Sequence, residues 1–457
     1  MPYDHSKQYR CPIVRGKALT DLDDLLPTYA HIIQEICPTN KTNFKESFNG
    51  KLAQFLAGAE KKTLDNHRTE IAGKLFGMYY EDSKETIQIS ERTLKLIEDS
   101  DQPSFFKDLC AKYQFPSCMN KMNTVMAQIN SGINIRQLSF VMKVIFELSN
   151  KRKIINKKEV GYYILNSLDV LSGNATPTDV ISQISEDRIN GMEREVSEPG
   201  REHSYNHQHI NEQLNLLALA NCIIFDNQNI IINYKEMDYI KKLSDKYNAP
   251  NSFDFSQYDL TNRDHRRKVQ IDYDKHFAKF SDLDKSVLNT PINSLINLTI
   301  PDAPQNSRID TNALGDEGEE YIYQLERSRV EKEFPRLVNK INKLGKIKGL
   351  GYDIQSVLGI KPKPEFAKYI EVKSTKRVSA PTDTFRDTIN LTRNEWTAAE
   401  QHKENFFIYR VYFCQNETKV FVIQNPFGLN NDGKIYAIPL SYRIDFDQKS
   451  GNFCASE

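Results

Sequence analysis

The sequence contains no long apolar run and no paired arrangement of cysteines. Its longest apolar stretch, residues 216–225, is interrupted by Asn221, whereas a membrane-spanning helix needs roughly 20 apolar residues, so we expect no membrane span. The polar N-terminus does not resemble a signal peptide. Seven cysteines without paired spacing argue against a disulfide framework and are typical of reduced thiols in a cytoplasmic protein.

An excess of either charge is also absent. The 61 basic and 61 acidic residues cancel, which argues against the generally basic surface of many nucleic-acid-binding proteins. This balance leaves room for local basic grooves. With 457 residues the chain exceeds one ordinary domain, and we predict about two to four domains.

The most informative pattern lies in two strand-like runs in the last third of the chain. One run contains Asp353, and the other contains Glu371 and Lys373. Because successive side chains of a strand point to opposite faces, Glu371 and Lys373 share a face while their apolar neighbours point into a core. The Lys-Pro-Lys-Pro sequence at residues 361–364 predicts a turn. The two runs are therefore expected to form a hairpin that brings Asp353 next to Glu371.

This combination of side chains favours metal-dependent hydrolysis of a phosphodiester. Two carboxylates suit Mg²⁺, which binds one or two carboxylates together with waters and phosphate oxygens. Such a metal activates water and neutralises charge that develops on the phosphate. Lys373 is placed to orient or help deprotonate that water, or to stabilise the transition state. The alternative from these residues alone is an edge strand with a solvated Glu/Lys pair.

The flanking sequence predicts an ordered set of helices and strands around this pattern. Acidic residues at 316–320 precede an amphipathic run and suit the first turn of a helix. Thr392 and Glu395 have the spacing of a capping box, which predicts a second helix. The expected order is helix, three strands, helix and two strands, with the third strand at residues 389–391 and the last two at 405–413 and 418–423.

Residues 313–446 resemble the NO VEIN C-terminal domain, a branch of the PD-(D/E)xK restriction-endonuclease-like fold. Four motifs carry the resemblance in the same order: Gly315-x-x-Gly318-Glu319, Gly351-Tyr352-Asp353-Ile354, Ile370-Glu371-Val372-Lys373 and Leu391-Thr392-Arg393-Asn394-Glu395-Trp396. One departure is that Tyr352 stands where the name of the fold suggests proline.

The resemblance implies the catalytic residues Asp353, Glu371 and Lys373. It implies as metal ligands Asp353, Glu371, the backbone carbonyl of Val372 and, from the first helix, Glu319. The implied cofactor is Mg²⁺, for which Mn²⁺ is expected to substitute.

The N-terminal two-thirds is predicted to be mainly helical, with two short hairpins. Strands are expected at residues 74–80 with 86–89, and at 221–225 with 230–234. Helical runs precede and follow each hairpin, a winged-helix pattern that is typical of DNA binding but also occurs in protein contacts. Residues 75–118 also resemble the N-terminal recognition region of AlwI-type restriction endonucleases, mainly in their apolar pattern.

Clusters of basic residues are the candidate DNA contacts, and for each the alternative is a solvated surface. The cluster before Asp353 is the most suggestive, because a phosphate backbone must pass beside the metal site. The candidates are Lys151, Arg152, Lys153, Arg266, Arg267, Lys340, Lys343, Lys346 and Lys348. His203, His207 and His209 form the one histidine cluster, and we interpret it as part of a polar loop at residues 190–211 rather than a zinc site.

The predicted fold is α/β and multidomain, with a mainly helical winged-helix region followed by a PD-(D/E)xK α/β/α core. We predict a DNA-recognition domain at residues 1–125, a second winged-helix-like domain at 126–255, a connector at 256–312 and a nuclease domain at 313–457. These features favour a site-specific endonuclease that acts on double-stranded DNA in restriction or phage defence. A homodimer is expected for double-strand cleavage, and a cognate methyltransferase is a candidate partner. The alternatives are a non-catalytic DNA-binding regulator or scaffold, and an RNA nuclease, for which no RNA-binding motif is present.

Overall fold

The structure is a computed structural model that describes residues 4, 6–14, 19–56, 58–197, 201–280, 313–347, 349–382 and 385–437. The chain forms two compact units. The first comprises Met1–Glu320, Lys373–Asn390 and Arg410–Phe421, and the second comprises Tyr321–Val372, Leu391–Tyr409 and Val422–Glu457. Within the described ranges, no helix combines the length and apolar character needed to cross a lipid bilayer, in line with the sequence prediction.

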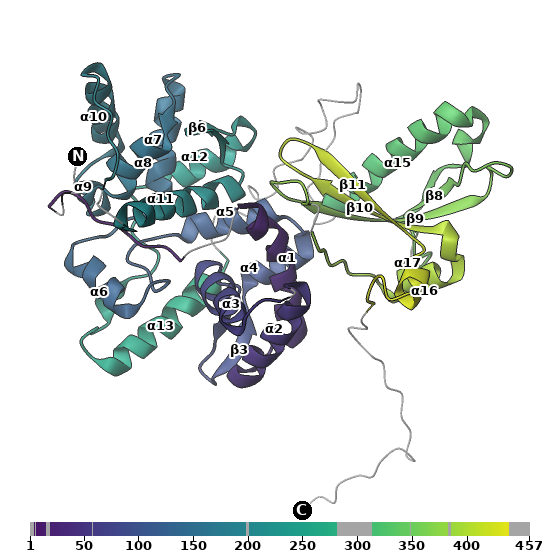
Figure 1. Cartoon of the computed structure of the whole chain (residues 1–457), viewed down its shortest axis with the longest axis horizontal. Helices are drawn as coiled ribbons and strands as arrows, with labels where there is room; N and C mark the ends of the chain where they lie inside the picture. Colours follow the sequence, from purple (N-terminus) through teal and green to yellow (C-terminus); the bar gives the residue numbers. More distant parts are fainter. Residues whose placement is uncertain are drawn as a thin grey trace, which may run out of the picture. The chain divides into compact units, whose positions relative to one another are not determined.

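The N-terminal region is mainly helical, as predicted (Figure 1). Its α-helices are α1 (Leu19–Ile36), α2 (Lys41–Phe55), α3 (Lys61–Asn66), α4 (Glu91–Asp99), α5 (Gln102–Lys112), α6 (Met122–Asn130), α7 (Gln137–Asn150), α8 (Lys157–Val160), α9 (Leu168–Leu171), α10 (Pro177–Ile189), α11 (Arg201–Leu219), α12 (Met237–Asp245) and α13 (Arg263–Ala278). Two π-helical segments, η1 (His67–Leu75) and η2 (Gly161–Leu165), and two 3₁₀ segments, η3 (Tyr234–Glu236) and η4 (Phe255–Gln257), complete the helical elements described there.

Both predicted hairpins are present in this region. The first pairs β2 (Tyr79–Glu81) with β3 (Thr86–Ile89), and the second pairs β5 (Ile223–Asp226) with β6 (Asn229–Ile232), each antiparallel. A two-residue strand extends each hairpin, β1 (Thr39–Asn40) alongside β3 and β4 (Ile155–Asn156) alongside β6. The two sheets therefore share one arrangement, β1-β3-β2 and β4-β6-β5.

Three sequence predictions differ from the structure of the N-terminal region. The first hairpin begins at Tyr79 rather than residue 74, because residues 74–75 complete η1 and Gly77 then adopts a positive φ of 57°. The second half of the predicted polar loop at residues 190–211 is helical, because α11 begins at Arg201. Part of the supposed connector forms α13, whose apolar side chains are buried; residues 281–312 lie outside the described part of the chain.

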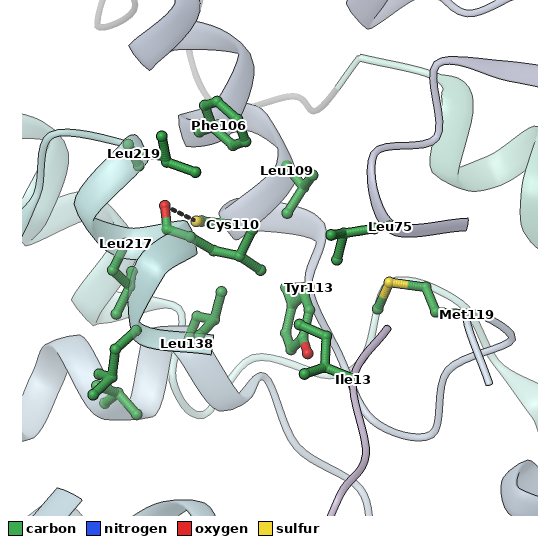
Figure 2. Close-up of a cluster of buried hydrophobic side chains, with 14 of the residues drawn as sticks. Ile13, Leu75, Phe106, Leu109, Cys110, Tyr113, Met119, Leu138, Leu217 and Leu219 are labelled. Atoms are coloured by element: carbon green, nitrogen blue, oxygen red, sulfur yellow. Dashed lines mark hydrogen bonds between the residues drawn. The ribbon is translucent and has the colours of Figure 1, made fainter. Parts of the chain in front are cut away.

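Helix α5 lies at the centre of the N-terminal core. All eleven of its residues are buried. Figure 2 shows Cys110 of α5 among apolar side chains of other elements, including Leu138 and Leu217, with its thiol directed at the carbonyl of Leu216. Burial on every side requires partners for the charged residues of α5. Lys107 pairs with Glu236 at 2.5 Å and Asp108 pairs with Arg92 at 2.5 Å.

Arg92 joins four parts of the N-terminal core. Its side chain is fully buried. The guanidinium donates to the Asp108 carboxylate, to the carbonyl of Phe76 after η1 at 2.7 Å and to the carbonyl of Phe277 in α13 at 2.9 Å. Because a guanidinium has several donors in one plane, it satisfies acceptors from α5, α13 and the end of η1 while extending from α4. This contact fastens α13 to the body of the region.

The C-terminal region contains a five-stranded sheet with the order β11-β10-β9-β8-β7. Its strands are β7 (Asn342–Lys343), β8 (Ile354–Val357), β9 (Ala367–Lys376), β10 (Phe406–Phe413) and β11 (Thr418–Gln424). Its helices are α15 (Ala313–Glu333), α16 (Arg393–His402) and α17 (Pro426–Asn431), with 3₁₀ segments η5 (Pro335–Lys340) and η6 (Lys403–Asn405).

Most of the predicted C-terminal elements are confirmed. The Thr392–Glu395 capping box is formed at the start of α16. The third strand predicted at residues 389–391 was wrong, because this segment has no regular structure and leads directly into α16. The two-residue strand β7, which the sequence did not indicate, pairs with β8 instead.

Helices α15 and α16 cover opposite faces of the sheet. Lys368 of β9 donates to Glu326 of α15 at 3.0 Å, whereas the next residue, Tyr369, stacks on His402 of α16 with ring centroids 3.8 Å apart. Adjacent side chains of a strand point to opposite faces, so the two helices must lie on different sides. The sheet is therefore the middle of three layers, in agreement with the view of α15 and α16 in Figure 1.

A buried polar network fixes α15 on its face of the sheet. The Glu326 side chain is 2% exposed and accepts hydrogen bonds from Ser356 of β8 at 2.7 Å, Lys368 at 3.0 Å and Tyr409 of β10 at 3.0 Å. Arg329, one turn along α15, adds a fourth contact at 2.7 Å. Burial alone would raise the pKa of Glu326, but Arg329, Lys368 and Ser356 outweigh it and lower that pKa to about 2.

The Arg92–Asp108 pair predicts a large effect on stability. Asp108→Ala leaves the Arg92 charge buried without its carboxylate, and we expect the free energy of unfolding to fall by about 3–5 kcal/mol. Urea denaturation of the full chain measures this change. Arg267→Ala is the matched control, since it breaks an exposed pair with Glu85 and should cost less than about 1 kcal/mol. An equal loss of stability in Asp108→Ala and Arg267→Ala would contradict a special role for the buried Arg92–Asp108 pair.

The Glu326 network predicts a pH-dependent contribution to stability. Because folding depresses the pKa of Glu326 from 4.5 to about 2, its contribution is complete above pH 4.5 and is lost as the pH falls toward 2. The shift corresponds to about 3 kcal/mol. In thermal unfolding between pH 7 and pH 3, the stability difference between wild type and Glu326→Gln should therefore narrow with falling pH. A stability difference that stays constant between pH 7 and pH 3 would show that ionised Glu326 is not the source of the effect.

Candidate active site

The antiparallel pairing of β8 with β9 brings Asp353 to the part of β9 that contains Glu371. The paired register ends with Ile354 opposite Ile370, and Asp353 lies in the bend just before β8. The backbone N–H of Asp353 donates to the carbonyl of Ile370 at 2.9 Å, and the N–H of Val372 donates to Asp353 Oδ2 at 2.8 Å. The predicted hairpin is confirmed, and a backbone hydrogen bond holds the Asp353 carboxylate against β9.

Glu371 is a buried carboxylate in the middle of β9. Its exposed fraction is 3%, close to that of its apolar neighbours Ile370 and Val372. The sequence had predicted burial for the apolar neighbours alone, but here both faces of β9 are covered. A carboxylate removed from water in this way is costly unless cations or donors surround it. Lys373 follows two positions later in β9 and is half-buried, so strand alternation puts it on the Glu371 face.

The chain reaches Asp353 through a turn that only glycine allows. Gly351 has a φ of +77°, and a Cβ atom at this position would lie 2.4 Å from the carbonyl oxygen of Asn394 in α16. Larger residues would therefore push the start of α16 away from β8. The turn sets the distance between this helix and the strand that presents Asp353.

Tyr352, at the position where the fold name suggests proline, has a packing role. Its ring lies 4.8 Å from that of Tyr369, which in turn stacks on His402. Burial lowers the pKa of His402, so its imidazole is neutral near pH 7. His402 was not among the site residues predicted from the sequence. Its place in the last turn of the predicted helix, just before the next strand, was the available signal.

Glu319 lies in the second turn of α15. Glu326 follows two turns later on the same helix face, and that face contacts the sheet through Ser356 and Lys368. Nearby in α15, burial raises the pKa of Glu317 to about 7, although Lys376 opposes this shift. The sequence grouped Glu317 with the acids of the helix start and did not distinguish it.

The basic residues before Asp353 are exposed along η5 and β7. Lys343 pairs directly with Ile354, the residue after Asp353, so this segment runs beside the strand that follows the carboxylate. Lys340 and Lys346 are also exposed, and Lys348 lies outside the described residues.

The basic candidates of the N-terminal region differ in their exposure to solvent and in their contacts within the protein. Lys151, Arg152 and Lys153 are exposed just after α7. Arg266 is half-buried and donates to the carbonyl of Leu260 at 2.6 Å, and Arg267 pairs with Glu85 at 2.9 Å. The structure thus separates an exposed basic turn from two arginines that are engaged within the fold.

Comparison with known proteins identifies both regions. The family model described as restriction endonuclease BpuJI, N terminal, matches residues 3–274, which is more than half of the chain. The model described as protein NO VEIN, C-terminal, matches residues 318–423. A search of curated proteins gives no match.

One solved structure is similar to the N-terminal region. It is titled "Crystal structure of pyrene- and phenanthrene-modified DNA in complex with the BpuJ1 endonuclease binding domain". It is 45% identical, with a TM-score of 0.58, and the match covers 60% of this chain and 99% of that chain. The sequence alone had pointed to AlwI-type enzymes for this region. The chain therefore belongs to the family of the BpuJI restriction endonuclease N-terminal domain, and its C-terminal region matches the NO VEIN C-terminal family.

Proposed function

We propose that this protein is a restriction-type DNA endonuclease whose C-terminal region is a divalent-metal-dependent nuclease of the PD-(D/E)xK class. The observation that carries the proposal is the β8–β9 hairpin, in which Asp353 bonds to the backbone of Ile370 and Val372, the two neighbours of Glu371. Lys373 follows two positions later on the same strand. The three-layer arrangement around the sheet supports the fold assignment. The match to the NO VEIN C-terminal family over residues 318–423 supports it independently.

The residues present fit a hard divalent cation such as Mg²⁺. Asp353 contacts the backbone on both sides of Glu371, and Glu371 is 3% exposed, a situation that a bound cation stabilises. In this proposal these two side chains and the backbone carbonyl of Val372 would hold the ion. Glu319 is not included as a ligand, because it shares a helix face with Glu326, and that face contacts the Lys368 side of the sheet. The bound ion supplies a water nucleophile at neutral pH and stabilises charge on the phosphate.

The chain's own groups position the reaction. The N–H of Val372 restrains Asp353 Oδ2, so this carboxylate keeps its orientation when DNA arrives. Lys373 presents a positive charge on the face that also carries Glu371, where it orients the attacking water or stabilises the pentacovalent transition state. The exposed Lys340, Lys343 and Lys346 offer contacts to the passing phosphate backbone.

The N-terminal region is proposed to select the DNA site. Its two hairpins, each preceded and followed by helices, suit a pair of winged-helix units that bind double-stranded DNA. The 45% identical solved structure, titled as a complex with modified DNA, supports this assignment. Each chain has one proposed active site, so cleavage of both strands favours a homodimer. A cognate methyltransferase would protect host DNA.

Cleavage assays test the catalytic proposal. Purified full-length protein is incubated with plasmid and phage DNA, modified and unmodified, with Mg²⁺ or with EDTA. Lys373→Ala and Glu371→Gln should each reduce the cleavage rate by at least about 100-fold, because transition-state charge stabilisation or metal binding is lost. Lys434→Ala, an exposed lysine paired with Asp432, should leave the rate unchanged.

The outcome also separates the two candidate functions. If wild type and Lys373→Ala leave every DNA equally intact with Mg²⁺, the catalytic proposal fails. Gel shifts with the same DNA then test a non-catalytic DNA-binding regulator or scaffold, the alternative function.

DNA binding without cleavage is measured in EDTA. Replacing Lys151 and Lys153 with alanine removes two exposed charges that we place at the phosphate backbone. Affinity should fall similarly for all sequences, and the slope of log K against log salt should decrease by about 2. Lys419→Ala, whose lysine pairs with Glu417, is the control. An unchanged salt slope in the double variant would show that this turn does not contact the DNA backbone.

A further inference from the structure

A cluster of three metal-ligand side chains lies in the N-terminal region, independent of the proposed nuclease site. Glu195 lies in the segment between α10 and α11, and His203 and His207 lie in α11. Ligand atoms of these three residues are all within 4.8 Å of one another. The sequence had predicted a polar loop for these histidines, and no local pattern connects them with Glu195.

The geometry of the cluster matches a tetrahedral metal site. His203 and His207 are four residues apart and project from one face of α11, with ring centroids 4.4 Å apart. Bonds of 2.0–2.1 Å at tetrahedral angles separate the ligand atoms of Zn²⁺ by roughly 3.3 Å. His207 Nε2 already lies 3.1 Å from Glu195 Oε1. All three ligand atoms lie within 4.8 Å of one another, so the other distances must shorten when an ion binds.

The carboxylate is held in place on both sides. Arg194 pairs with Asp187 of α10 at 2.8 Å, and Val196 is 1% exposed, so the backbone around Glu195 is anchored. Lys158 of α8 lies 2.8 Å from Glu195 Oε2, the oxygen that does not face His207. A partner of this kind orients a ligating carboxylate and leaves its other oxygen for the metal.

The two histidines have buried nitrogen atoms without partners. Among the described residues, neither Nδ1 of His203 nor Nε2 of His207 has a hydrogen-bond partner, because the approach of His207 to Glu195 lacks hydrogen-bonding geometry. Unsatisfied buried nitrogen atoms are costly and require an explanation.

The surroundings leave room for a fourth ligand. The cluster borders a surface pocket of about 420 Å³, whose other lining residues are Lys157, Lys158, Ile210, Asn211 and Gln228. His209 is not part of the site, because its Nδ1 accepts a hydrogen bond from the N–H of Ile13 at 3.2 Å. The third histidine of the sequence cluster thus has a structural partner, and the pocket gives a water molecule access to a fourth coordination position.

We propose that Glu195, His203 and His207 bind one divalent transition-metal ion per chain, of the kind represented by Zn²⁺. Two imidazoles and one carboxylate favour such an ion over Mg²⁺ or Ca²⁺, which take mainly oxygen ligands. The ion joins the segment that follows α10 to the first turns of α11. It thereby stabilises the half of the N-terminal region that carries the β4-β6-β5 sheet.

Metal titration of the full-length chain tests this proposal. All measurements use a Glu371→Gln background, so that the proposed nuclease site does not contribute to binding. EDTA-stripped protein titrated with Zn²⁺ should bind one equivalent, and Co²⁺ should give the visible absorption of a tetrahedral site. His207→Ala and Glu195→Gln should each weaken Zn²⁺ binding at least tenfold. Binding that persists unchanged in both variants would overturn the proposal.

Matched controls and a thermal readout guard against misfolding. Glu193→Gln alters a carboxylate of the same segment outside the cluster, and His265→Ala removes a histidine of α13; both should retain one equivalent of Zn²⁺. Zn²⁺ should raise the melting temperature of the background protein and of these controls, but not of His207→Ala or Glu195→Gln. An equal increase in melting temperature in every variant would refute the site. Without metal, each variant should have the same melting temperature as the metal-free background protein.

Discussion

The antiparallel register between β8 and β9 is the constraint on which the C-terminal region depends. It pairs Ser356 with Lys368, which sets the Glu326 network and hence α15 on one face. The same hairpin holds Asp353, just before β8, against the backbone of Ile370 and Val372, which flank Glu371. Because the side-chain period of a strand is two, a slip by one residue would turn Lys368 and Glu371 to the wrong faces. One set of backbone hydrogen bonds therefore specifies both the layer order and the candidate active site.

Buried charges recur at the points where several elements meet. Arg92 with Asp108 joins four elements of the N-terminal core, and Glu326 with Lys368 joins a helix to three strands. Each charge is surrounded by hydrogen-bond partners, which offsets much of the cost of removing it from water. Such contacts favour one arrangement over near alternatives, because a misplaced helix would leave a charge without its partner. Rigid placement of this kind suits the proposed endonuclease, which would have to align an active site on DNA.

The N-terminal region uses one small arrangement twice. Each hairpin receives a two-residue third strand, and the sheets β1-β3-β2 and β4-β6-β5 have equivalent orders. The proposed metal ion belongs to the second of these units, where Glu195 follows α10 and Lys158 belongs to the short helix after β4. In this proposal the bound ion stabilises the part of the N-terminal region that contains the β4-β6-β5 sheet. Arg92 and its partners stabilise the part that contains the β1-β3-β2 sheet.

Local patterns in the sequence determined the hairpins, the capping box at Thr392 and the carboxylate–lysine pattern, because turn residues, caps and strand alternation act over a few positions. Tertiary structure decided what depended on distant partners. The strands β1, β4 and β7 are two residues long and exist only because a neighbouring strand pairs with them. Likewise, α13 joins the core through its contact with Arg92. Glu371 is buried because helices cover both faces of β9. Glu195 approaches His207 only after α11 has folded. These outcomes join residues far apart in the sequence, and no local pattern encodes such a contact.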